Sequence, residues 1–92
     1  MKKKIKNGLR EIFNKHDPIG IYFGKETNFD EYDPEISGVI IRFNRSKNVS
    51  EFTSEIHNLF TKMFGKEIAG EKSKYKNLAK EVYEFLNKKL NK

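Results

Sequence analysis

The chain has 92 residues, a formal net charge of +6, eight phenylalanines, four tyrosines and no cysteine. This length favours a single domain over residues 1–92, with a modest core supplied largely by aromatic side chains. The lack of cysteine excludes disulfides, thiolate metal sites and cysteine nucleophiles. No apolar stretch has the length of a membrane-spanning helix, and polar residues interrupt the basic start before a signal-peptide core forms. We therefore expect a cytoplasmic protein without a membrane partner.

Apolar residues recur at helical spacing in the first segment of the chain. Ile5, Leu9, Ile12 and Phe13 share one face of a helix. Asp17 ends this helix, because the residue before a proline avoids the α region. Residues 18–31 then form a predicted loop.

The second segment is ambiguous between helix and strand. Residues 38–43 have strand propensity. However, Ile36, Val39, Ile40 and Phe43 also fall on one helical face, Asp33 is a suitable N-cap, and proline follows at the first helical position. We predict a helix over residues 34–44.

Two further helices complete the prediction of an all-α fold, a compact bundle of four short helices. The third begins at Asn48, which starts a capping-box-like pattern, and ends at Gly65. The fourth runs to about residue 90, with Ser73 as a possible cap. Their apolar faces comprise Phe52, Ile56, Leu59, Phe60 and Met63 in the third helix, and Tyr75, Leu78, Ala79, Val82, Phe85 and Leu86 in the fourth.

A long acidic loop is predicted between the first and second helices. Residues 17–36 contain six acidic residues and one lysine, a net charge of −5 in an otherwise basic chain. Such polarisation is typical of a recognition surface. The alternative is that these acids are neutralised internally by lysines of the first and fourth helices.

Motifs for catalysis or metal binding are absent from the sequence. There is no metalloprotease, nucleophile-elbow or phosphate-loop pattern, and the acidic loop lacks the ligand spacing and glycine of an EF-hand. Neither His16 nor His57 has a second residue at the spacing of a catalytic or metal-binding motif. We therefore predict no enzyme activity, no catalytic residues, no metal and no cofactor.

Lysines at both ends of the chain suggest an alternative function, that of a small basic nucleic-acid-binding protein. Their scatter around the predicted helices and the lack of a helix-turn-helix signature make a solvated surface the simpler interpretation. The basic residues concerned are Lys2, Lys3, Lys4, Lys6 and Arg10 near the start and Lys72, Lys74, Lys76, Lys80, Lys88 and Lys89 near the end.

Two short motifs resemble a small bacterial family. His16-Asp17-Pro18-Ile19-Gly20 is followed by Asp30-Glu31-Tyr32-Asp33, and this pair is similar to motifs of the DUF1871-like group of short proteins of unknown function, where the first position is commonly Trp. The resemblance implies that the second motif leads into a helix, and that an immunity-type role beside a toxin is plausible.

The leading hypothesis is a protein-interaction module, most concretely an immunity-type protein that neutralises a cognate toxin by binding it. Acidic residues of the loop would meet a basic surface on the partner, and Tyr22, Phe29 or Tyr32 would supply an aromatic anchor. The predicted partner-binding residues are Asp17, Phe29, Asp30, Glu31 and Tyr32.

Overall fold

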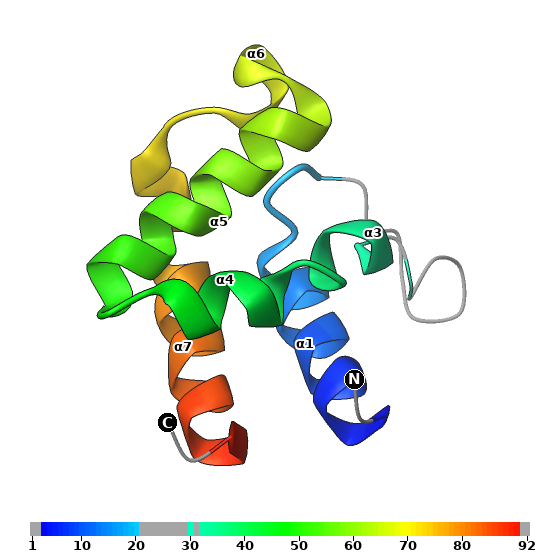
Figure 1. Ribbon diagram of the computed structural model, residues 1–92. Coiled ribbons are helices and arrows are strands. Elements are labelled where there is room, and N and C mark those ends of the chain that lie inside the picture. The colour runs from blue at the N-terminus through cyan, green and yellow to red at the C-terminus, as the bar shows by residue number, and fades with distance from the viewer. Residues whose placement is uncertain (1–2, 21–29, 31, 91–92) are drawn as a thin grey trace.

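The computed structural model describes residues 3–20, 30 and 32–90, and in this part of the chain every regular element is helical. The all-α prediction is thereby confirmed. None of the described helices is both long enough and apolar enough to cross a membrane. The elements in chain order are α1 (Lys3–His16), α3 (Asp33–Ile36), α4 (Val39–Arg45), α5 (Val49–Phe64), α6 (Lys66–Ala69), the 3₁₀ helix η1 (Lys72–Tyr75) and α7 (Lys76–Leu90) (Figure 1).

Helix α1 packs its apolar face against α7 and α3. Leu9 and Phe13 are fully buried, and Ile5 and Ile12 nearly so, as the helical spacing predicts. Gly8 lies where α1 meets α7, and a Cβ added there would come within 2.2 Å of the Phe85 ring. A side chain at position 8 would therefore have to displace the Phe85 ring.

The predicted second helix forms as two helices, α3 and α4, with a two-residue turn between them. Ser37 and Gly38 separate the two pieces, and the Ser37 hydroxyl donates to the Pro34 carbonyl at 2.8 Å. Gly38 favours such a break, because glycine has more backbone freedom to lose in a helix than other residues. Ile36, Val39 and Phe43 are still buried in the core, so the helical spacing was the correct interpretation and the strand was not.

Helix α5 begins and ends where the sequence predicts. The Asn48 side chain accepts a hydrogen bond from the Glu51 amide at 2.9 Å, and Glu51 in turn accepts one from the Lys47 amide at 2.8 Å. Gly65 terminates the helix with φ at 87°, in the range that favours glycine. The prediction that Met63 joins the apolar face was wrong, since its side chain is 47% exposed.

The chain returns from α5 to α7 through α6 and η1, two short elements that the sequence does not predict. Ser73 lies within η1 and does not cap a helix. Tyr75 anchors the return, because its side chain is fully buried and its hydroxyl donates to the Ala69 carbonyl. Burial raises the pKa of this hydroxyl.

The core joins two groups of aromatic rings. In the first, Phe13 and Phe60 stack with ring centroids 6.0 Å apart, and Tyr32 lies 6.0 Å from Phe60. In the second, the Phe43 ring meets Phe52 and Tyr83 edge-on. Helix α5 contributes a ring to each group and packs directly against α7 (Figure 1).

Candidate functional site

Tyr32 joins the two motifs that the sequence singles out. Its side chain is 1% exposed, and its hydroxyl donates to Asp17 Oδ1 at 2.6 Å while accepting the Ile19 amide at 3.1 Å. We call these two hydrogen bonds the Tyr32 contact. They tie the turn after α1 to the residue that precedes α3, although thirteen to fifteen positions separate them in sequence.

The turn after α1 has a backbone suited to this contact. Asp17 has φ at 42°, a left-handed conformation that aspartate tolerates better than most residues. Its amide donates to the Phe13 carbonyl at 2.7 Å, and its carbonyl accepts the Gly20 amide at 3.0 Å. Gly20 also has positive φ, at 75°. The chain thus reverses tightly and brings the Asp17 carboxylate to Tyr32.

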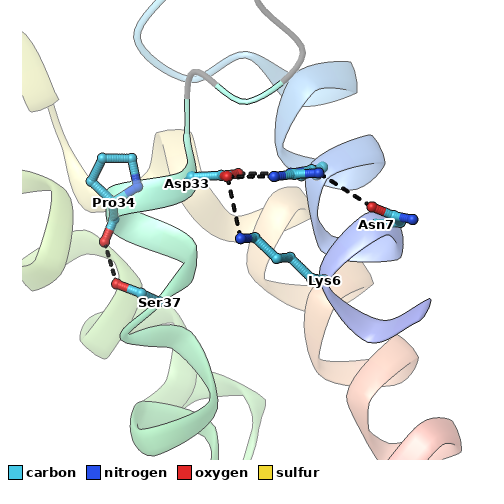
Figure 2. Close-up of polar contacts among 6 residues, drawn as sticks. Lys6, Asn7, Asp33, Pro34 and Ser37 are labelled. Carbon is cyan, nitrogen blue, oxygen red and sulfur yellow. Dashed lines mark hydrogen bonds and ion pairs between the residues drawn. The ribbon is translucent and has the colours of Figure 1, made fainter. Parts of the chain in front are cut away.

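Asp33 forms ion pairs with α1 and does not cap α3. Figure 2 shows its carboxylate directed toward α1, where Arg10 donates from Nε at 2.8 Å and from Nη2 at 2.5 Å, and Lys6 Nζ lies at 3.5 Å. The hydrogen bond from Arg10 is the main reason why the pKa of Asp33 is lowered. The N-cap prediction was wrong, since Tyr32 occupies that position and no side chain caps the helix.

The structure places the predicted partner-binding residues in different settings. Tyr32 is a core side chain and offers no surface to a partner, so its prediction as an aromatic anchor needs correction. Asp17 is half-buried and bound to Tyr32, whereas Asp30 is exposed. Phe29, Glu31 and the other candidate anchor, Tyr22, lie outside the described residues.

Much of the described acidic segment is engaged within the protein. Asp17 is held by Tyr32, Asp33 by α1, and Glu35 is only 2% exposed. Internal neutralisation, the alternative left open by the sequence, therefore holds for Asp33. Asp30 is the exposed carboxylate among the described residues of this segment.

Both histidines have structural contacts. His16 Nε2 lies 2.8 Å from a carboxylate oxygen of Glu81, which also accepts from Lys15 at 2.7 Å. These hydrogen bonds, that from Lys15 first, lower the pKa of Glu81. His57 Nε2 lies 2.9 Å from the Gly70 carbonyl. Within the described ranges no group of three or more histidine, aspartate or glutamate side chains is arranged to hold a metal ion.

A basic hollow lies away from the acidic segment. It has a volume of about 400 Å³ and is formed by the first turns of α5, by η1 and by the first turns of α7. We call it the lysine hollow. Its lining residues are Val49, Ser50, Thr53, Lys72, Ser73, Lys76 and Lys80.

The sequence analysis included the three lysines of this hollow among the basic residues near the end of the chain. It did not predict that they line one site. Their four-residue spacing was the available signal, since residues i and i+4 share a helix face. The turn η1, which brings Ser73 and Lys72 beside α5, has no comparable signature.

Comparison with known proteins adds no relative: the chain matches no family model, no curated protein and no solved structure. The resemblance to the DUF1871-like group stays a prediction from the two motifs.

Proposed function

We propose that this chain is a protein-interaction module, most concretely an immunity-type protein that neutralises a toxin by binding it. The observation that supports the proposal is the exposed Asp30, which lies next to two residues that the fold holds firmly. Tyr32 is anchored in the core, and Asp33 is paired with Arg10 and Lys6.

The carbonyl of Asp30 is tied to α3. The Asp33 amide donates to it at 3.0 Å, which closes a turn at the start of α3. Exposed acids of this kind chiefly accelerate the encounter with a basic surface. The partner is therefore expected to be a protein with a basic patch.

The experiment begins with capture of the partner by the tagged protein in its own host, followed by kinetics with the purified partner. Asp30→Asn combined with Glu31→Gln should leave the melting temperature nearly unchanged. The same pair should slow association and weaken its dependence on salt, because steering by exposed charges is screened by salt. Glu67→Gln, an exposed acid on α6, is the matched control.

The immunity role has its own readout. Co-expression of the chain should protect cells from the partner, and the Asp30/Glu31 pair should protect less at equal protein level. Unchanged association together with a lower melting temperature would show that these acids serve the fold, and the proposal would then be abandoned.

A further inference from the structure

We propose that the lysine hollow binds the sugar–phosphate backbone of nucleic acid without reading base sequence. This inference is independent of the protein-interaction function, because it rests on other residues at the other side of the molecule. In Figure 1, η1 and the start of α5 lie on the left and α3 lies on the right.

The surface of the hollow is mostly apolar, but the side chains around it include types that contact phosphate. Proteins contact phosphate oxygens through lysine, through serine and threonine hydroxyls, and through helix N-termini. The hollow combines Lys72, Lys76 and Lys80 with two serines, Ser50 in the first turn of α5 and Ser73 in η1. Lys76 and Lys80 are one helical turn apart, about 6 Å along α7.

The lysines of the hollow are exposed, and none of the ion pairs within the described part of the chain involves them. Three of the acidic residues on the neighbouring helices have other partners, whereas Glu71 and Glu84 are exposed near the hollow. Glu51 accepts from the Lys47 amide, Glu55 pairs with Arg45, and Glu81 pairs with Lys15 and His16 of α1. The positive end of the α5 dipole adds to the same potential. The lysines outnumber Glu71 and Glu84, so a polyanion would meet an excess of positive charge here.

The residues that line the hollow favour nucleic acid over an acidic protein as its ligand. Anchors at protein interfaces are mostly tryptophan, tyrosine and arginine, and the hollow is lined by none of them. Sequence-tolerant stacking of bases needs aromatic side chains, which this lining also lacks. Backbone contact by lysine is what remains, so affinity should not depend on base sequence.

The test is a fluorescence anisotropy titration of the full chain with a labelled mixed-sequence DNA duplex at several salt concentrations. Three phosphate contacts predict a slope of log affinity against log salt of about −2.7. The variant Lys72→Gln, Lys76→Gln, Lys80→Gln should bring the slope close to zero and lower the affinity about tenfold or more at low salt, since each such lysine contributes about 1 to the slope. A duplex of different sequence should bind equally.

The matched control is Lys62→Gln, Lys66→Gln, Lys88→Gln, which removes the same charge from exposed positions outside the hollow. It should retain most of the affinity and slope. Equal losses in the two triple variants, or no binding by the parent protein at low salt, would overturn the proposal. Competition by polyglutamate as effective as that by unlabelled duplex would instead identify an acidic protein as the occupant. Asp30→Asn should bind DNA like the parent, which keeps this test separate from that of the interaction module.

Discussion

Removing one hydroxyl tests whether the Tyr32 contact holds the two motifs together. Tyr32→Phe keeps the ring packed against Phe13 and Phe60 but deletes a donor to Asp17 and an acceptor for the Ile19 amide. A hydrogen bond contributes about 0.5–1.5 kcal/mol net, and about 1.5–3 kcal/mol when one partner is charged. Water reaches Asp17 and Ile19, which are only half-buried, and replaces part of the loss. We therefore expect about 1–3 kcal/mol of destabilisation.

Urea denaturation followed by circular dichroism measures the change in the free energy of unfolding, and a thermal melt measures the accompanying change in Tm. For a domain of this size, each kcal/mol lowers Tm by about 4–8 °C, so the variant should melt at least about 4 °C lower. Tyr83→Phe is the matched control, because Tyr83 packs on the second aromatic group and its hydroxyl has no hydrogen bond among the described residues. If Tyr32→Phe were no less stable than Tyr83→Phe, the Tyr32 contact would not hold the motifs in solution.

Three further changes test the helices and the acidic segment. Phe43→Ala should cost about 3–5 kcal/mol in a denaturant titration, since the ring is fully buried against Phe52 and Tyr83; an unchanged midpoint would contradict its burial. Gly8→Ala should destabilise by about 1–3 kcal/mol through its clash with Phe85, and Phe85→Ala in the same chain should make the alanine tolerable; additive losses in the double variant would refute the clash. The lowered pKa of Asp33 means that this carboxylate adds stability above its unfolded pKa of about 3.9, and that the gain is lost as pH falls through its lower folded pKa. Stability measured from pH 6 downward should therefore fall less steeply in Asp33→Asn than in the parent, and parallel curves would contradict the Arg10 pairing.

The sequence predicted the helices well where local chemistry determines them. The spacing of Leu9 and Phe13, the Asn48 cap and the Gly65 terminator each act within a few residues, and all three are present in the structure. The division between α3 and α4 and the short elements α6 and η1 depend on packing against other helices, which periodicity does not encode. Ile36 and Phe43 stay on the buried side despite the break, so the apolar pattern alone could not reveal it.

The candidate site was harder to predict because its residues change role on folding. Tyr32, Asp33 and Glu35 look alike in the sequence as members of an acidic, surface-like stretch. Folding buries the first in the core, pairs the second with an arginine twenty-three positions away and covers the third. Long-range pairing of this kind leaves no local signal, since Arg10 lies on the predicted first helix among several other basic residues.

The contact between the two motifs stabilises the fold, so a partner-binding site should be sought among other residues. Within this chain, the Tyr32 to Asp17 contact contributes to the fold, and these two side chains offer little to a partner. Both proposals therefore rest on charges that the fold leaves exposed. Asp30 lies on one side of the molecule, within electrostatic reach of Arg10, and the lysine hollow lies on the other, so the two sites would attract partners of opposite sign. Because the two lie on different elements, substitutions at one should leave binding at the other intact, and the two proposals can be tested separately in a single chain.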